Sequence, residues 1–283
     1  MAKKTIQIVT QRNWQAEELQ AKGWETRHSF GLDVPNHKRN DSWWFPQAYA
    51  VRLNKSLKHH SQPPLALTSP NETLLPNTPR EHSGRRIGTV TVYDALNSIV
   101  EWPDNLWWKM ATAKNDDFVC QPLTHHELIT LLETLNLPYN SLLHFSEELP
   151  TIISEHRFFI ADREIKACSG YLKDGMTIYD GATFTEDEIA AARTKALEVL
   201  DDESFEMPRA FVMDVAVTVE GAYVLEYNPA WCSGWYDCEI GGVLEVVKLS
   251  TNPTKKEVKL WGYEPDEFLL SRMSVPLPLA PVK

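Results

Sequence analysis

The sequence predicts an α+β fold, because capped helices are each followed by a pair of short strands along the 283-residue chain. Thr124 and Thr185 each begin a capping box, with Glu127 and Glu188 three residues later. Two strand pairs follow at 151–169 and 209–228. Paired strands that follow helices are typical of antiparallel sheet in layered α+β proteins.

The composition is that of a folded protein, with 43% hydrophobic and 24% charged residues. The net charge of −11 disfavours nucleic acid and anionic membranes as partners. No apolar segment is long enough for a signal peptide or a membrane span. The four cysteines include no Cys-x-x-Cys pair, so we expect a reduced, cytoplasmic protein.

The N-terminal third predicts a small lobe that ends in a linker. A strand is expected at 5–9 and a helix at 14–22, closed by Gly23. Segment 60–84 holds five prolines, which is typical of a long loop or linker. We therefore expect an α/β N-terminal lobe over 1–84 and a second domain over 85–283. The run 41–46 fits either a packed lobe interface, which we favour, or a stacking surface.

The second domain begins with an expected helix at 90–100 and a buried strand at 106–110 that carries Lys109. A hairpin at 209–228 carries the strongest chemical signal. Because Gly221 suits the third position of a three-residue loop, Thr218 should pair with Ala222.

Counting back along this hairpin places Asp214 opposite Glu226, with Asn228 on the same face. Two adjacent carboxylates repel each other unless a cation lies between them. Two carboxylates and an amide oxygen form a ligand set that suits Mg²⁺. The alternative is that both acidic residues are half-exposed and that Asn228 only starts a turn.

The spacing of Asp214, Glu226 and Asn228, followed by Pro229, resembles the metal-binding signature of the ATP-grasp superfamily. Segment 153–169 is similar to the hairpin that follows the adenine hinge of that family, and 106–110 is similar to its nucleotide-lysine strand. The resemblance covers about 85–250 and is greatest to ligases of the ribosomal-protein glutamate-ligase type.

The resemblance implies an ATP-grasp fold, in which two α+β subdomains grip ATP behind a smaller N-terminal lobe. It further implies a carboxylate–amine ligase that forms an acylphosphate, acting on a small-molecule or peptide carboxylate and an amine. The implied site residues are as follows: Asp214, Glu226 and Asn228 for Mg²⁺; Lys109 for the α/β-phosphates; Arg157 for the transferred phosphoryl group; residues 145–149 for adenine; and either Glu148 or Glu155 for ribose.

Three positions depart from the family pattern. A segment with Lys114 replaces the usual glycine-rich flap, so Lys114 is expected to cover part of the phosphates. Arg85 or Arg86 stands in for an upstream lysine, and Val212 replaces an arginine found in some members. A phosphotransferase on the same fold, or a non-catalytic Trp-rich binding protein, are the alternative functions.

Cys232 and Cys238 follow the metal hairpin in an aromatic loop with Gly234. A zinc site is conceivable, but the spacing is not a recognised one. We expect this loop to line the pocket of the acceptor substrate.

Overall fold

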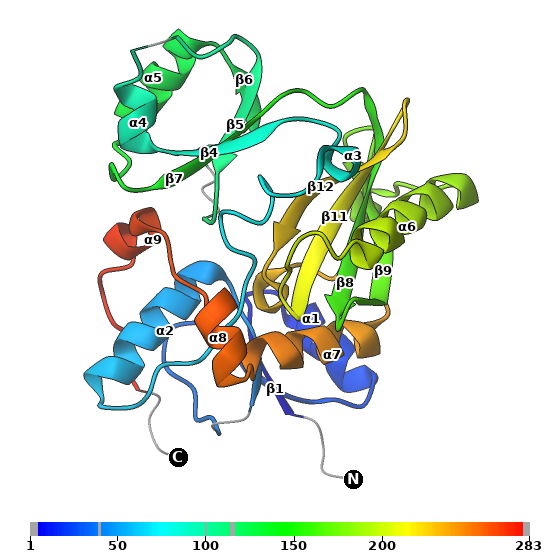
Figure 1. The fold of residues 1–283 in the computed structure, drawn as a ribbon. Helices are drawn as coiled ribbons and strands as arrows, with labels where there is room; N and C mark the ends of the chain where they lie inside the picture. The colour runs from blue at the N-terminus through cyan, green and yellow to red at the C-terminus, as the bar shows by residue number, and fades with distance from the viewer. Residues whose placement is uncertain (1–4, 39–40, 100, 114–116, 280–283) are drawn as a thin grey trace.

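The computed structural model describes residues 5–38, 41–99, 101–113 and 117–279. The predicted α+β architecture is confirmed: the described residues form a small parallel sheet, two antiparallel sheets and the helices that flank them (Figure 1).

The N-terminal lobe contains the parallel sheet, with strand order β2-β1-β3. Parallel strands need a crossover connection, and α1 supplies it between β1 and β2. The predicted strand at 5–9 is confirmed, and the helix expected at 14–22 begins one residue early. The elements are β1 (Thr5–Val9), α1 (Asn13–Ala21), β2 (Glu25–Ser29), β3 (Ser42–Trp44) and α2 (Gln47–His59).

The second sheet is antiparallel, with order β4-β7-β5-β6, and it forms the upper subdomain in Figure 1. The short helix α4 and the capped helix α5 pack with it around the buried Trp108. Its elements are β4 (Ile87–Thr91), α4 (Val92–Leu96), β5 (Leu106–Met110), β6 (Gln121–Leu123), α5 (His125–Leu135) and β7 (Leu142–Ser146).

The predicted bounds of the helix at 90–100 are wrong at both ends. Val90 and Thr91 belong to β4, and the helix covers Val92–Leu96 only. Thr91 caps the helix by accepting a hydrogen bond from the backbone N–H of Asp94 at 3.0 Å. The β-branched run before this cap favours the extended conformation, which pairs with β7.

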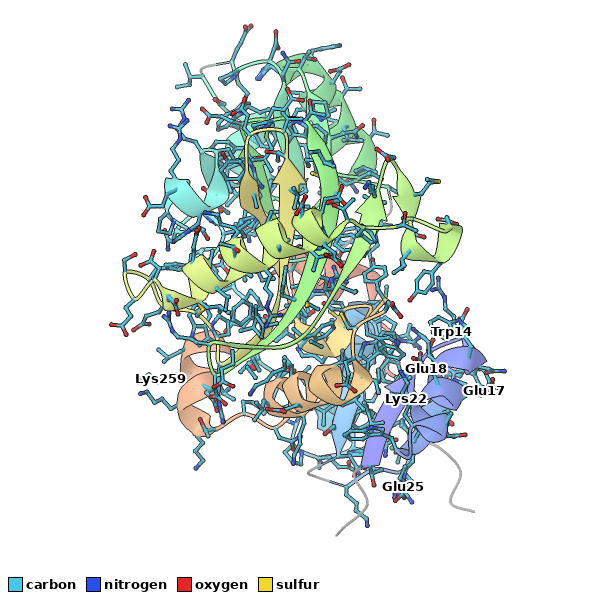
Figure 2. The ribbon with its side chains drawn as sticks, turned by 90° about the vertical axis from the view of Figure 1, so that its right-hand side faces the viewer. Trp14, Glu17, Glu18, Lys22, Glu25 and Lys259 are labelled. Atoms are coloured by element: carbon cyan, nitrogen blue, oxygen red, sulfur yellow. The ribbon has the colours of Figure 1, made fainter. Side chains whose placement is uncertain are left out.

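The third sheet has order β10-β9-β8-β11-β12, and α6 and α7 cover its opposite faces. Side chains alternate along β11, so Phe211 and Met213 pack toward α6 and Val212 packs toward α7. Figure 2 shows α6 lying across the outer face of this sheet. The elements are β8 (Ile152–Ala161), β9 (Glu164–Lys173), β10 (Met176–Thr177), α6 (Glu186–Asp201), β11 (Ala210–Thr218), β12 (Ala222–Asn228) and α7 (Ile240–Thr251).

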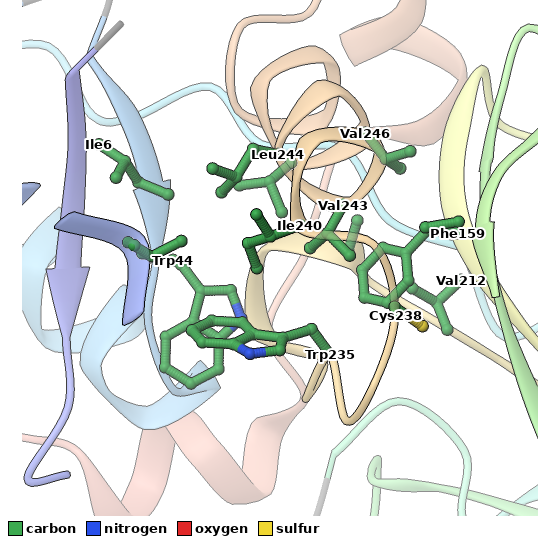
Figure 3. Packing of buried hydrophobic residues seen from close by; sticks show 14 of the residues in the cluster. Ile6, Trp44, Phe159, Val212, Trp235, Cys238, Ile240, Val243, Leu244 and Val246 are labelled. Carbon is green, nitrogen blue, oxygen red and sulfur yellow. The ribbon is translucent and has the colours of Figure 1, made fainter. Parts of the chain in front are cut away.

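Helix α7 also joins the N-terminal lobe to the third sheet. Ile6 and Trp44 from the parallel sheet and Phe159 from β8 contribute to one buried cluster around it (Figure 3). Trp44 contacts Trp235 at 5.1 Å between ring centroids, and its Nε1 donates to the carbonyl of Ser233 at 2.9 Å. The run 41–46 is thus mostly buried packing, which is the alternative that we favoured. The boundary at residue 84 stays a prediction.

The C-terminal segment returns to the N-terminal lobe. Lys55 on α2 donates to the carbonyls of Leu270 and Met273, at 3.2 and 2.9 Å. Within the described residues, no helix combines the length and apolar character that a membrane span requires. The remaining elements are α3 (Arg80–Ser83), η1 (Ile178–Asp180), η2 (Ala230–Cys232), α8 (Lys255–Trp261) and α9 (Glu267–Arg272).

Candidate nucleotide and metal site

The β11–β12 hairpin places Asp214 opposite Glu226, but the register of the rest of the hairpin differs from the predicted one. Asp214 is opposite Glu226 as predicted, but Val217, not Thr218, pairs with Ala222. A bulge that leaves Leu225 unmatched restores the register between these two positions. Bulges often redirect a side chain beside a functional site. Here Leu225 lines a cavity, whereas its neighbour Val224 is fully buried in the core.

Asp214 lies in the centre of the sheet with no exposed surface. The neighbouring strand β8 places Arg157 beside it in register. The guanidinium Nε and Nη2 donate to the two carboxylate oxygens at 2.8 and 2.6 Å. A buried carboxylate needs such a partner, because an uncompensated charge would cost several kcal/mol. Burial opposes the charged form of Arg157, but Asp214 outweighs it and raises the pKa of the guanidinium.

The rest of the Arg157 side chain is enclosed. The rings of Tyr171 and Tyr236 lie 5.2 and 5.1 Å from the guanidinium carbon, and Nη1 donates to the carbonyl of Gly234 at 3.1 Å. Its exposed fraction is 4%. A direct contact between Arg157 and a phosphoryl group would therefore require the guanidinium to leave part of this arrangement.

Glu226, Asn228 and Lys109 continue the contact chain from Asp214. The amide nitrogen of Asn228 donates to Asp214 at 3.1 Å and to Glu226 at 2.7 Å. Lys109, on β5 of the other antiparallel sheet, donates to the second oxygen of Glu226 at 2.6 Å. The structure thus joins Arg157, Asp214, Asn228, Glu226 and Lys109 in one continuous network across the two subdomains.

Asp214, Glu226 and Asn228 carry the oxygen atoms that a hard divalent cation prefers, although Arg157 and Lys109 contact the two carboxylates in this structure. One amide group contacts both carboxylates, so the three side chains converge on one place. A half-turn of the Asn228 amide would direct its oxygen toward the same place. Such an all-oxygen set suits Mg²⁺.

Neither cysteine of the aromatic loop belongs to a metal cluster in the described part of the chain. Among the described residues, the side chains of Glu81, His82 and Asp202 lie close enough together to hold a metal ion. Cys238 is buried, and burial raises the pKa of its thiol to about 12.

A cavity of about 500 Å³ lies beside Lys109 and Glu226. Its wall includes all of residues 145–149, the predicted adenine hinge, which covers the end of β7 and the start of the connection to β8. Glu148 and Glu155 both line it. Glu148 is exposed, whereas the half-buried Glu155 accepts a hydrogen bond from the hydroxyl of Tyr171. Burial raises the pKa of the Glu155 carboxyl.

The two candidate arginines differ in their surroundings. Arg85 is buried and donates to the backbone carbonyls of Val224 and Leu225, both at 3.0 Å, so it braces the bulge. Burial lowers the pKa of its guanidinium to about 10. Arg86 is ion-paired with Glu147 of the hinge at 2.6 Å. Lys114 lies outside the described residues.

The structure adds residues to the site that the sequence analysis does not identify. Tyr171 shields Arg157, and His144 pairs with Lys109 across the strands β5 and β7. Burial lowers the pKa of His144 to about 4, so its ring is neutral near pH 7. No local motif marks either residue, because both positions depend on sheet order. Tyr236 belongs to the aromatic loop that we expected beside the substrate.

Comparison with known proteins agrees with the fold. Residues 38–247 match the model of an ATP-grasp domain family, the third family of a RimK-related clade. The match covers most of the chain, and the chain therefore belongs to the ATP-grasp superfamily, within this RimK-related clade. This confirms the family resemblance. No curated protein sequence matches the chain.

Several solved structures are similar to this chain at low sequence identity. D-cycloserine synthetase DcsG is 13% identical, with a TM-score of 0.50, and the match covers 87% of this chain and 98% of that one. A RimK domain ATP-grasp protein from Sphaerobacter thermophilus is also 13% identical, with a TM-score of 0.44 and coverage of 87% and 99%. D-alanine–D-alanine ligase from Bacillus anthracis is 12% identical, with a TM-score of 0.47 and coverage of 96% and 99%.

Proposed function

We propose that this protein is an ATP- and Mg²⁺-dependent carboxylate–amine ligase that works through an acylphosphate. The observation that carries the proposal is the network from Arg157 to Lys109, two members of which, Glu226 and Lys109, line the same cavity as the hinge. Membership of the ATP-grasp superfamily, typical of ATP-dependent C–N ligases, supports the same activity.

In this proposal the nucleotide occupies the cavity with its base at the hinge. Backbone groups of 145–149 contact adenine. Glu148 binds the ribose, because it is exposed at the cavity and has no hydrogen-bond partner among the described residues, whereas Glu155 is already bound to Tyr171. Lys109 leaves its present partner Glu226 and contacts the phosphates, to which its ammonium group presents a compact positive charge.

Asp214, Glu226 and Asn228 would hold the metal ion. Mg²⁺, when bound, neutralises phosphate charge and polarises the terminal phosphoryl group. Arg157 fixes the Asp214 carboxylate and adds positive charge behind it. Lys114 covers the phosphates in the place of a glycine-rich flap.

The two chemical steps need positioning more than a side-chain nucleophile. A carboxylate oxygen of the substrate attacks the terminal phosphorus, and ADP leaves. The amine nitrogen then attacks the acyl carbon, the bond from that carbon to the phosphate oxygen breaks, and inorganic phosphate leaves. The proton lost by the amine is carried away by phosphate or solvent.

The test is ADP release in the presence of Mg²⁺, ATP and pairs of amino acids or short peptides. The proposal expects ADP and an amide, identified by mass spectrometry, only when both co-substrates are present. ADP with a stable phosphorylated product would favour the phosphotransferase instead. Failure of any nucleotide to bind in the presence of Mg²⁺ would favour a non-catalytic binding protein.

A further inference from the structure

A further cavity, of about 600 Å³, lies on the other side of β5 from the proposed nucleotide cavity. Leu106 lines it, whereas the next residue, Trp107, lines the nucleotide cavity, and successive side chains of a strand point to opposite faces. Phe145 and Glu147 line both cavities. Its volume is within the range of about 300–1,000 Å³ that is usual for small-molecule sites.

Positive charge predominates around this cavity. The charged residues that line it in the described part of the chain are Arg80, Arg85, Arg86 and Glu147. Three arginines therefore accompany one carboxylate, in a chain whose net charge is −11. Such a local excess of positive charge on an acidic protein attracts anions to that place.

Two of the arginines share the single carboxylate. Glu147 Oε1 accepts from Arg86 Nε at 2.6 Å, and Oε2 accepts from the backbone N–H of Arg86 at 3.0 Å and from Arg80 Nη2 at 3.5 Å. A guanidinium group carries five N–H donors, of which Glu147 takes one from each side chain. Both arginine side chains are largely exposed, at 70% and 78%, and can therefore donate to an anion that enters from solvent.

The third arginine is a fixed positive charge in the wall. Arg85 is buried, and its guanidinium donates to the carbonyls of Ser83, Val224 and Leu225 at 2.9, 3.0 and 3.0 Å. These hydrogen-bond partners are neutral carbonyl groups, so they hold the side chain without cancelling its charge. Burial lowers the pKa of Arg85 to about 10, which still leaves the group charged near pH 7.

Aromatic rings supply the apolar part of the cavity. Trp102 and Phe145 both line it, with their ring centroids 5.2 Å apart. Aromatic walls suit a flat apolar body, and arginine forks suit a carboxylate or a phosphate group. We infer that this cavity binds a small organic anion, whose flat body lies against Trp102 and Phe145 and whose charged group replaces Glu147 at Arg80 and Arg86. This site is separate from the proposed reaction centre, and the inference does not rest on the ligase function.

The test is a saturation-transfer NMR titration of the whole protein, with Mg²⁺ and β,γ-imido-ATP present to occupy the nucleotide cavity. The probes are benzoate and phenyl phosphate, each compared with a neutral counterpart, benzamide and phenol. Inorganic phosphate, measured by competition, is the anion without an aromatic body. We expect at least one aromatic anion to bind about fivefold or more tightly than both its neutral counterpart and inorganic phosphate.

Two variants should change the affinity for that anion in opposite directions. Arg80→Gln should weaken it about threefold to tenfold, because a charged donor is lost. Glu147→Gln should strengthen it about threefold or more, because the competing carboxylate is removed. Arg193→Gln, which changes an exposed arginine outside this cavity, is the control and should leave the affinity unchanged.

Binding by neither anion, equal binding of anion and neutral counterpart, or equal affinity in Arg80→Gln and Glu147→Gln would each overturn the inference. Failure of β,γ-imido-ATP to bind would count against the proposed function alone, because the opposite effects of Arg80→Gln and Glu147→Gln locate the anion without any nucleotide.

Discussion

The two carboxylate oxygens of Asp214 are both held by the guanidinium group of Arg157, at 2.8 and 2.6 Å, in the middle of the five-stranded sheet. Neither side chain can be removed alone without leaving a buried charge. This pair is therefore both a structural requirement of the sheet and the fixed end of the proposed metal site.

Arg157→Gln should destabilise the protein by about 3–5 kcal/mol, because it leaves the Asp214 carboxylate without a counter-charge. Adding Asp214→Asn should recover much of that loss, since no buried charge then remains. Urea denaturation measures both effects. Arg209→Gln, which breaks the exposed pair with Asp162, serves as the control and should cost less than about 1 kcal/mol. A double variant no more stable than Arg157→Gln would contradict this account.

Lys109→Met should weaken the binding of Mg²⁺·ATP about tenfold to a hundredfold, because a charge-assisted contact with the phosphates is lost. Fluorescence titration with a labelled ATP analogue measures the affinity. Lys166→Met is the control, since Lys166 pairs with Glu164 and Glu245, outside the proposed site. Equal affinities in the two variants would show that Lys109 does not contact the nucleotide.

Glu148→Gln should lower the affinity for ATP about tenfold and reduce the preference for ATP over 3′-deoxy-ATP, because a carboxylate that accepts from a ribose hydroxyl is removed. Glu155→Gln should keep that preference. Competition binding with the two nucleotides distinguishes the variants. If Glu155→Gln abolishes the preference and Glu148→Gln keeps it, the ribose ligand is Glu155.

Stability should fall as the pH is lowered from about 6.5 to about 4. Burial lowers the pKa of both His144 and His156 to about 4, so the unfolded chain binds protons in this window that the folded protein does not bind. Each histidine can contribute up to about 3 kcal/mol to this loss.

His156→Gln tests that pH dependence through one of the two residues. Between pH 6.5 and 4, the free energy of unfolding of the variant should depend less steeply on pH than that of the parent. The difference in slope should correspond to the uptake of up to one proton fewer on unfolding. Urea denaturation at a series of pH values measures the slope. Parallel curves for variant and parent would contradict a neutral, buried His156.

Local signals in the sequence predict a large part of the fold. The capping boxes at Thr124 and Thr185 begin helices where expected, since side chain and backbone satisfy each other within one turn. The β-branched run at 89–91 favours a strand over a helix, and this strand pairs with β7. A pattern within one segment cannot report such a distant partner.

The hairpin shows why a site is harder to predict than its elements. The spacing predicts the pairing of Asp214 with Glu226 but not the bulge at Leu225, where Arg85 from another segment donates to the backbone carbonyls of Val224 and Leu225. The enclosure of Arg157 by Tyr171 and Tyr236 likewise joins residues far apart in the sequence. Motif spacing therefore predicts which residues are candidate ligands, whereas the contacts around them depend on the tertiary fold.

The most direct test of the central claim, that the β11–β12 hairpin holds Mg²⁺ against the phosphates of ATP, is calorimetric binding of ATP across a Mg²⁺ titration. The parent should bind ATP more tightly as Mg²⁺ rises. Glu226→Gln, which removes one ligand charge from a half-buried position, should lose that dependence, and the exposed control Glu164→Gln should retain it. The same Mg²⁺ dependence in Glu226→Gln and in the parent would contradict the claim.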